Sequence, residues 1–171
     1  MINIIRGTLY FVTLCLIQVL VLNNIHFLRL ATPLLYVYFI IKLPVGYSPV
    51  QTLFLSFLMG IMIDILSNTP GMHVAACTLV GFIRPKMIRL FKRENLPDNI
   101  APSFSSFSYG SFVRFAITLV AIHHLSLFLI ESLALFDILY FSIRFIAGVL
   151  TTIILIIIVE TFHKTPKRGG D

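Results

Sequence analysis

The sequence predicts an all-α, polytopic membrane protein that forms one integral membrane domain over residues 1–171. Two observations carry this prediction. Hydrophobic residues make up 58% of the chain and charged residues only 12%, with a mean hydropathy of +0.97, so the polar surface of a soluble domain cannot be built. The apolar residues also fall into blocks close to the roughly 20 residues with which a helix crosses a bilayer.

Six apolar blocks predict six transmembrane helices. The first carries Arg6 near its start and stops before Asn23 and Asn24. It lacks a small-residue cleavage site and another apolar block follows at once, so we expect a retained helix rather than a removed signal. The second block carries Arg29 near its start and Pro33 within it. The expected helices cover residues 4–22, 26–43, 49–66, 72–91, 111–130 and 138–159.

The fourth block is the least apolar of the six. Its uncharged stretch, residues 74–83, is too short to cross a bilayer alone. We expect Arg84, Lys86 and Arg89 to extend outward to the headgroups, as long basic side chains do. The sixth block, at 138–159, is the most continuously apolar and is long enough to cross a bilayer without basic side chains extending from it.

Basic residues predict the orientation of the helices. With a cytoplasmic N-terminus and six crossings, the thirteen Lys and Arg residues other than Arg29, Arg114 and Arg144 all fall on the inner side. The turn at 67–72 has no charge and the turn at 131–137 has only acidic ones, so both belong outside. We therefore predict an N-in, C-in topology. The net charge of +6 follows from this asymmetry and indicates no nucleic-acid partner.

Five basic residues at the end of the fourth block form what we call the basic segment: Arg84, Lys86, Arg89, Lys92 and Arg93. Over residues 85–94, apolar and basic side chains alternate with helical spacing, which predicts a short amphipathic helix on the inner leaflet. Two interpretations stay open: the charges set topology and contact anionic headgroups of membrane lipids, or they dock an acidic cytoplasmic partner. Residues 95–110, rich in Ser, Phe and Pro, are expected to form a loop.

Three charged residues lie where lipid disfavours them, namely Asp64, Arg29 and Arg144. A charge at the bilayer centre costs roughly 2.5–3.5 kcal/mol on insertion scales, which suggests a partner. With the predicted topology all three residues lie in the outer half of the bundle. One hypothesis pairs Asp64 with Arg29 or Arg144 across a cavity open to the outside. In the alternative, each charge reaches the nearby interface separately.

Small residues indicate where helices pack closely. Gly60, Gly81 and Gly148 lie within expected helices, where the lack of a side chain lets a neighbour approach. Gly60 and Asp64 are four residues apart and share a helix face, so a helix packed on Gly60 also meets Asp64. Gly71 follows in a charge-free Pro-Gly turn.

No motif for catalysis or cofactor binding is present. The sequence has no Gly-x-Ser-x-Gly elbow, no His-Glu-x-x-His pair and no Walker-type phosphate loop. Adjacent His123 and His124 point about 100° apart on a helix and cannot bind one ion together, so we expect no metal. Cys15 and Cys77 lie within apolar blocks and are expected to act as small hydrophobic residues. The sequence thus predicts that the protein is not an enzyme.

Residues 33–85 resemble the MreD family, the multi-pass membrane subunits of the bacterial cell-shape (elongation) machinery. The resemblance rests on a proline followed by an apolar run at 33–37, on Gly60 and Asp64 at the end of a helix, and on the polar turn at 70–73. The chain length, the six-block hydropathy and the basic loop behind the fourth block agree with it as well.

The resemblance implies a non-enzymatic scaffold of the bacterial inner membrane. MreD proteins act with MreC, a bitopic partner, and connect to the actin-like MreB and to the RodA glycosyltransferase with its transpeptidase. The resemblance also implies a fold similar to the substrate-binding subunits of energy-coupling-factor vitamin transporters. Such a subunit, with a vitamin pocket open to the outside, is the alternative function.

Loop lengths favour the scaffold over the vitamin-binding subunit. The outer turns at 23–25, 67–72 and 131–137 are short and leave little chain to cover a pocket. With a scaffold, we expect a surface that includes Gly60, Asp64 and Gly71 to contact MreC or a second copy of the chain.

Overall fold

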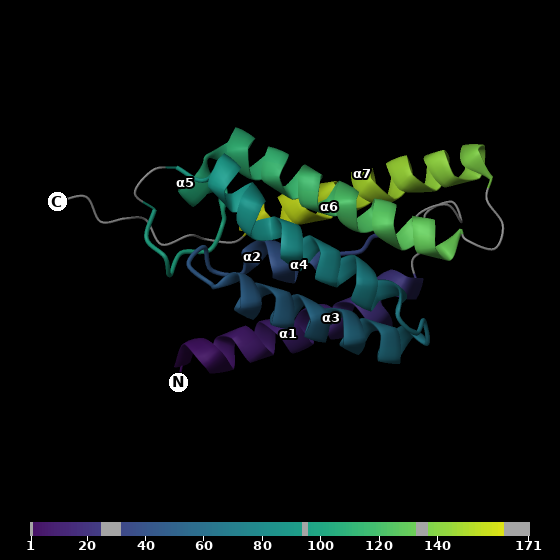
Figure 1. The fold of residues 1–171 in the computed structure, drawn as a ribbon, viewed down its shortest axis with the longest axis horizontal. Helices are drawn as coiled ribbons and strands as arrows, with labels where there is room; N and C mark the ends of the chain where they lie inside the picture. The colour runs from purple at the N-terminus through teal and green to yellow at the C-terminus, as the bar shows by residue number, and fades with distance from the viewer. Residues whose placement is uncertain (1, 25–31, 94–95, 133–136, 163–171) are drawn as a thin grey trace.

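The computed structural model describes residues 2–24, 32–93, 96–132 and 137–162. These residues form helices, turns and loops, and they contain no strand. Five long helices lie side by side along one axis in a single bundle (Figure 1): α1 (Ile2–Leu20), α3 (Pro49–Ser67), α4 (Met72–Phe91), α6 (Tyr109–Glu131) and α7 (Ile138–Phe162). The short helices are η1 (Leu22–Asn24), α2 (Val37–Lys42) and α5 (Phe104–Phe107).

Four stretches of helix are long and apolar enough to cross a membrane: Gly7–Asn24, Pro49–Ser67, Tyr109–Glu131 and Ile138–Phe162. Helix α4 has 20 residues but carries Arg84, Lys86 and Arg89, which lower its hydropathy. The all-helical architecture of the described residues and these four helices are compatible with the membrane-protein class predicted from composition.

The long helices run in two opposite directions along the bundle (Figure 1). Helices α1, α3 and α6 run from the left end to the right, and α4 and α7 run back. We call the end that carries residues 67–72, at the right of Figure 1, the turn end. We call the end that carries residues 96–108, at its left, the loop end.

The predicted helix over 26–43 is wrong in its described part. Residues 32–34 are extended, 35–36 form a turn, and the helix is limited to the six residues of α2. Pro33 explains why no helix runs through this point, because proline lacks an amide hydrogen and disfavours a helical conformation at residue 32. We call residues 32–36 the broken segment.

Side chains from other helices satisfy the backbone of the broken segment. Gln18 Nε2 donates to the Pro33 carbonyl at 3.0 Å, and Gln18 Oε1 accepts from the Leu35 amide at 2.8 Å. Thr152 Oγ1 accepts from the Leu34 amide at 3.0 Å. Buried backbone groups need such partners, so these two side chains make the interruption of the helix tolerable.

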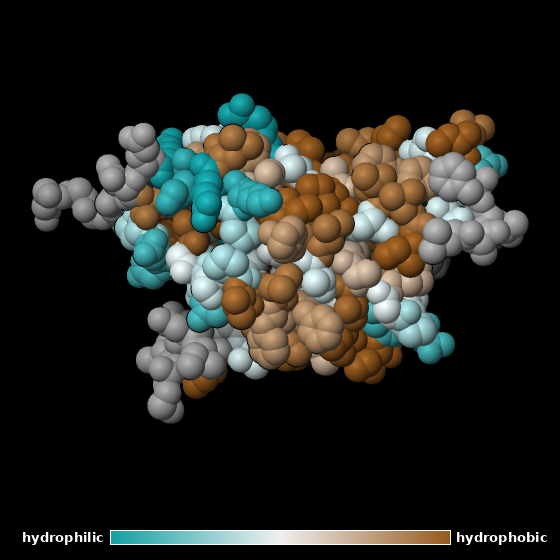
Figure 2. Space-filling view, in the orientation of Figure 1, coloured by the Kyte–Doolittle hydropathy of each residue, from teal (hydrophilic) through white to brown (hydrophobic). Residues whose placement is uncertain are grey.

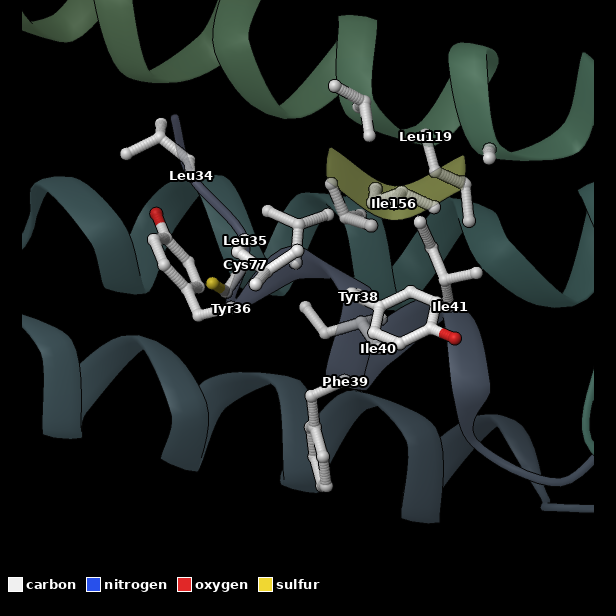
Figure 3. Packing of buried hydrophobic residues seen from close by; sticks show 14 of the residues in the cluster. Leu34, Leu35, Tyr36, Tyr38, Phe39, Ile40, Ile41, Cys77, Leu119 and Ile156 are labelled. Carbon is white, nitrogen blue, oxygen red and sulfur yellow. The ribbon is translucent and has the colours of Figure 1, made fainter. Parts of the chain in front are cut away.

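Residues 34–41 form the centre of the core. All are buried, and Tyr36, Tyr38, Ile40 and Ile41 have no exposed surface. Figure 3 shows this stretch enclosed by the long helices, with Leu119 of α6 and Ile156 of α7 among the side chains around it. Residues 34–41 of the second apolar block therefore lie inside the bundle.

The predicted close approaches at glycines are confirmed. A Cβ added to Gly60 would lie 2.5 Å from the Val74 Cα, and one added to Gly81 would lie 2.5 Å from the Ser56 Oγ. A Cβ on Gly148 would lie 2.9 Å from the ring of His124. Gly60 and Gly81 thus set the contact of α3 with α4.

Two expectations about residues 85–110 are wrong. The described part of 85–94 is no separate surface helix, because α4 continues through Pro85 to Phe91 and buries Ile88 in the core. Residues 95–110 are not all loop. Ser103 caps α5 by accepting from the Ser106 amide, and α6 begins at Tyr109.

Candidate functional site

Asp64 holds the start of α4. Its Oδ1 accepts from the His73 amide and from the Thr69 hydroxyl, each at 3.0 Å. Its Oδ2 accepts from the amides of Gly71 at 3.1 Å and Val74 at 2.9 Å. The first amides of a helix have no partner within the helix and carry partial positive charge, so a carboxylate placed there is well satisfied. Asp64 is buried, and its structural role is to accept from the first amides of α4.

The hypothesis that Asp64 pairs with Arg144 is wrong, because the start of α4 already supplies donors to both oxygens of Asp64. Arg144 instead makes two hydrogen bonds of 3.0 Å to the carboxylate of Glu131. Its guanidinium also lies 4.7 Å from the ring centre of Phe128. Arg29 lies outside the described residues, so its pairing stays a prediction.

Of the two glycines predicted to join Asp64 at a docking surface, only Gly71 is exposed. Gly60 is buried against the start of α4. Gly71 has a φ of 87°, a left-handed conformation that glycine adopts without strain. Gly60, Asp64 and Gly71 therefore shape the turn between α3 and α4, and the surface presented there belongs to its exposed residues, Asn68, Pro70 and Gly71.

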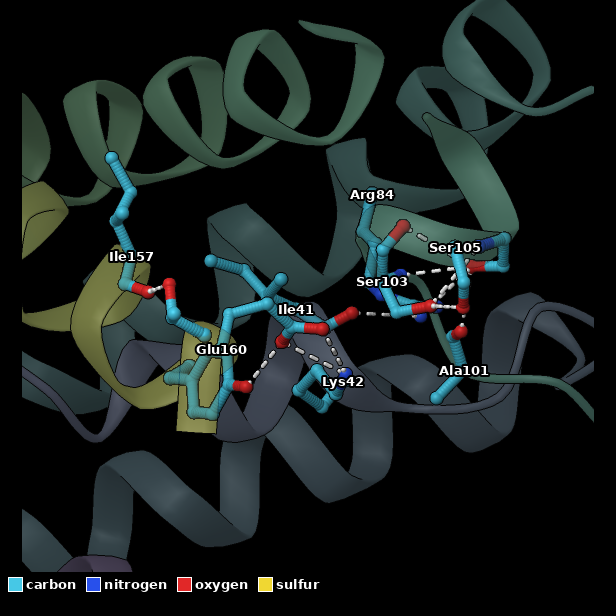
Figure 4. A network of polar contacts seen from close by, with 11 residues as sticks. Ile41, Lys42, Arg84, Ala101, Ser103, Ser105, Ile157 and Glu160 are labelled. Carbon is cyan, nitrogen blue, oxygen red and sulfur yellow. Dashed lines mark hydrogen bonds and ion pairs between the residues drawn. The ribbon is translucent and has the colours of Figure 1, made fainter. Parts of the chain in front are cut away.

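Arg84 does not extend to the headgroups as predicted. It is 1% exposed, and its guanidinium donates to the carbonyls of Ile41 and Leu43 at the end of α2 (Figure 4). A cation is favoured at the C-terminal end of a helix, where carbonyls lack partners. The four other members of the basic segment, Lys86, Arg89, Lys92 and Arg93, are exposed.

A buried ion pair joins α2 to α7 (Figure 4). The Nζ of Lys42 lies 3.0 Å from the Oε2 of Glu160, and the Tyr38 hydroxyl donates to the same oxygen. The side chains of Lys42 and Glu160 are 9% and 2% exposed. The sequence interpretation placed Lys42 at the inner end of the second expected helix and overlooked Glu160, although an acid directly after the most apolar block can signal a buried partner.

Two histidine side chains contact the Tyr36 hydroxyl in the core. The oxygen lies 2.6 Å from Nδ1 of His73 in α4 and 2.9 Å from Nε2 of His123 in α6. We call Tyr36, His73 and His123 the central trio. Sequence reasoning missed the central trio because Tyr36 was expected to lie in a continuous helix. The three residues also lie far apart in the sequence, so no local motif contains them.

The neighbouring His124 serves a different contact. Its Nδ1 lies 2.9 Å from the Val120 carbonyl, and its Nε2 lies 3.3 Å from the Thr152 hydroxyl that holds the broken segment. The two adjacent histidines thus have separate partners, as their angular offset on the helix requires. The described residues contain no group of three His, Cys, Asp or Glu side chains that could hold a metal ion.

A small pocket lies between α6 and α7 at the turn end. Its volume is about 110 Å³, compared with the roughly 300–1,000 Å³ of typical small-molecule sites. The lining residues are Phe128, Glu131, Ser132, Asp137, Tyr140, Phe141 and Arg144.

The surface separates into an apolar body and a hydrophilic end. Figure 2 shows hydrophilic side chains gathered mainly at the loop end, at its left, and apolar side chains over most of the remaining visible face. Among the large apolar residues exposed on the long helices are Leu9, Phe54 and Leu150. This distribution fits helices surrounded by lipid with their basic end in water.

Comparisons with known proteins identify no relative. A scan against protein-family models, a search of curated proteins and a search of solved structures match nothing to this chain.

Proposed function

We propose that this chain is a non-enzymatic scaffold of the bacterial inner membrane that positions proteins of the cell-elongation machinery. One observation carries the proposal: Asp64, Arg84, Lys42 and Glu160, buried charged side chains of the described residues, each contact other groups of the chain. Asp64 holds the start of α4, Arg84 holds the end of α2, and Glu160 pairs with Lys42. In a catalytic site such groups face a cavity and are available to substrate. In this chain the buried charged groups instead hold helix ends in place, which favours a rigid protein that binds other proteins.

In this proposal the chain crosses the membrane six times with both termini inside. Helices α1 and α3 run in the same direction (Figure 1), so the chain has to return between them. The broken segment and α2 form the returning crossing. The irregular backbone of the broken segment is tolerated because it is buried in protein. The exposed basic residues at the loop end favour a cytoplasmic location for that end.

The resemblance of residues 33–85 to MreD supports the choice of partners. We propose MreC and the RodA glycosyltransferase with its transpeptidase, with MreB as a further partner inside the cell. A second copy of the chain is also a candidate. The exposed turn residues Asn68, Pro70 and Gly71 are the proposed contact on the outer side, in place of the buried Gly60 and Asp64. The exposed basic residues are proposed to contact anionic lipids on the inner side.

The vitamin-binding subunit remains the second candidate, because the pocket between α6 and α7 opens on the proposed outer side and has aromatic and charged walls. Its volume of about 110 Å³ favours the scaffold, since a vitamin needs several times that space.

Site-specific photo-crosslinking in native bacterial membranes tests the proposal. A photoreactive amino acid replaces Pro70 in the exposed turn, and in the control it replaces Leu150, an exposed apolar residue of α7. We expect the Pro70 probe to capture MreC, RodA or the transpeptidase, and the Leu150 probe to capture them less. Capture of transporter ATPases and a coupling subunit supports the vitamin-binding alternative. Equal capture by both probes contradicts a docking role for the turn.

A further inference from the structure

The hydrogen count of the central trio restricts its proton positions. The Tyr36 hydroxyl has one hydrogen, so it donates to one histidine and accepts from the other. Its two partners are Nδ1 of His73 and Nε2 of His123. One of these nitrogens therefore carries a hydrogen and the other presents a lone pair. Two arrangements, with opposite directions of donation, satisfy this requirement.

The second nitrogen of His123 distinguishes the two arrangements. His123 has no exposed surface, and its Nδ1 has no hydrogen-bond partner among the described residues. When Nε2 donates to Tyr36, Nδ1 is a bare acceptor. When Nε2 accepts from Tyr36, Nδ1 carries a buried hydrogen without an acceptor. An orphaned buried donor is the rarer and costlier case, so the first arrangement is favoured while both histidines are neutral.

Protonation of His73 reverses the direction. A positively charged His73 carries hydrogens on both nitrogens, so its Nδ1 donates to the Tyr36 oxygen. The hydroxyl then donates to Nε2 of His123. His123 releases its Nε2 hydrogen to water and takes one from water on Nδ1, so its own number of hydrogens is unchanged. The trio gains one proton from water, held on His73, and His123 stays neutral in its other tautomer.

The surroundings make His73 the residue that takes the proton. It stands at the start of α4 and is half-buried, whereas His123 is enclosed by the core. Its amide is bonded to the Asp64 carboxylate, which places a negative charge near the ring. The ionisable groups that act electrostatically on the trio from the elements around it are Asp64 of α3, Cys77 of α4, and His124 and Glu131 of α6.

We propose that His73, Tyr36 and His123 form a proton-binding site that converts protonation at the turn end into a change of tautomer in the core beside the broken segment. The protonated state leaves Nδ1–H of His123 buried without an acceptor. It therefore favours a rearrangement around Tyr36 that supplies one, or the entry of a water molecule. This inference does not depend on the identity of any docking partner.

Nuclear magnetic resonance of the full chain, labelled with ¹⁵N-histidine in lipid nanodiscs, tests the proposal between about pH 8 and about pH 5. Bare and hydrogen-bearing ring nitrogens give separate ¹⁵N signals, and single His→Gln variants assign the five histidines. We expect the His123 hydrogen to move from Nε2 to Nδ1 at the same midpoint at which His73 becomes protonated. An unchanged His123 tautomer while His73 protonates overturns the proposal.

Matched variants separate the site from general effects of pH. In Tyr36→Phe, His123 should no longer follow His73, whereas Tyr140→Phe, at an exposed tyrosine of α7, should leave the coupling intact. If Tyr36→Phe does not fold, His73→Gln provides the same test, because His123 should then keep one tautomer throughout. A tautomer change of equal size and midpoint in Tyr36→Phe or His73→Gln also overturns the proposal.

Discussion

Lys42 at the end of α2 and Glu160 in the last turns of α7 form an ion pair of 3.0 Å inside the bundle. The two residues are 118 positions apart in the sequence. Their contact fixes the short helix that follows the broken segment to the last long helix. Because both side chains are almost completely buried, either charge is costly when its partner is removed.

We expect Glu160→Gln and Lys42→Met each to lower the free energy of unfolding by about 3–5 kcal/mol, the cost of leaving a buried charge unpaired. The double variant should recover part of this loss, since it leaves no isolated charge. Glu131→Gln is the control, because it breaks the exposed pair with Arg144 and should cost only about 0–1 kcal/mol. Thermal unfolding in detergent measures all four. Equal losses in Glu160→Gln and Glu131→Gln would contradict the burial argument.

Asp64 and Arg144 should act independently, because each is bonded to different partners. Asp64→Ala removes the acceptor of three amides and should cost at least the 1–3 kcal/mol of one unsatisfied buried donor. Asp64→Asn keeps one acceptor oxygen and should cost less. In a double-mutant cycle with Arg144→Gln, the effects on unfolding should add within about 0.5 kcal/mol. A larger coupling would restore the pairing hypothesis.

Uninterrupted apolar blocks predicted the long helices, including Tyr109–Glu131 and Ile138–Phe162, and two of the predicted helices also have local signals at their starts. The expected helix over 49–66 is found as Pro49–Ser67, which starts at a capping box formed by Ser48 and Gln51. The expected helix over 72–91 is found as Met72–Phe91, directly after Gly71. Each start depends on residues within a few positions of the sequence.

The features that could not be predicted depend on distant residues. Pro33 was visible, but the partners that make the break stable, Gln18 and Thr152, lie in α1 and α7. Arg84 was expected to contact headgroups because its actual partners depend on the early end of α2. The carbonyls that accept from Arg84 lack helix partners only because α2 ends at Lys42. Asp64 was expected to find a cation, whereas backbone amides, which leave no mark in the sequence, satisfy it.

Gly60→Ala should disrupt the contact between α3 and α4. Its Cβ would lie 2.5 Å from the Val74 Cα and 2.8 Å from the His73 carbonyl oxygen, and backbone atoms cannot move aside as a flexible side chain can. We expect a marked fall in the midpoint of thermal unfolding. The control is Gly7→Ala in α1, where nothing lies within 4 Å, and alanine should be neutral or stabilising by up to about 1 kcal/mol. Equal tolerance of both changes would disprove the close contact.

Gln18→Leu should release the broken segment. It removes the donor to the Pro33 carbonyl and the acceptor of the Leu35 amide, and each buried group left unpaired costs about 1–3 kcal/mol. Gln18→Glu keeps an acceptor for the Leu35 amide and should be milder. Hydrogen exchange at the Leu35 amide measures the effect, and we expect faster exchange in Gln18→Leu. Unchanged protection there would show that other contacts hold the segment.

Arg84 and the exposed basic residues should affect different properties. Arg84→Gln weakens the charged contact with the Leu43 carbonyl at the end of α2, so it should lower stability without changing membrane charge preference. Reversal of Arg89, Lys92 and Arg93 to Glu should leave the fold stable, because these side chains are exposed.

The triple reversal should instead weaken contact with anionic lipids by roughly 1 kcal/mol per lost basic residue, or invert the chain in the membrane. Lipid preference is measured by the anionic phospholipid retained on purification, and topology by cysteine labelling from each side. The parent protein and Arg84→Gln are the comparisons. If the triple reversal retained as much anionic lipid as the parent and kept its topology, the exposed basic residues would serve neither role. Their remaining candidate role would be to dock an acidic cytoplasmic partner.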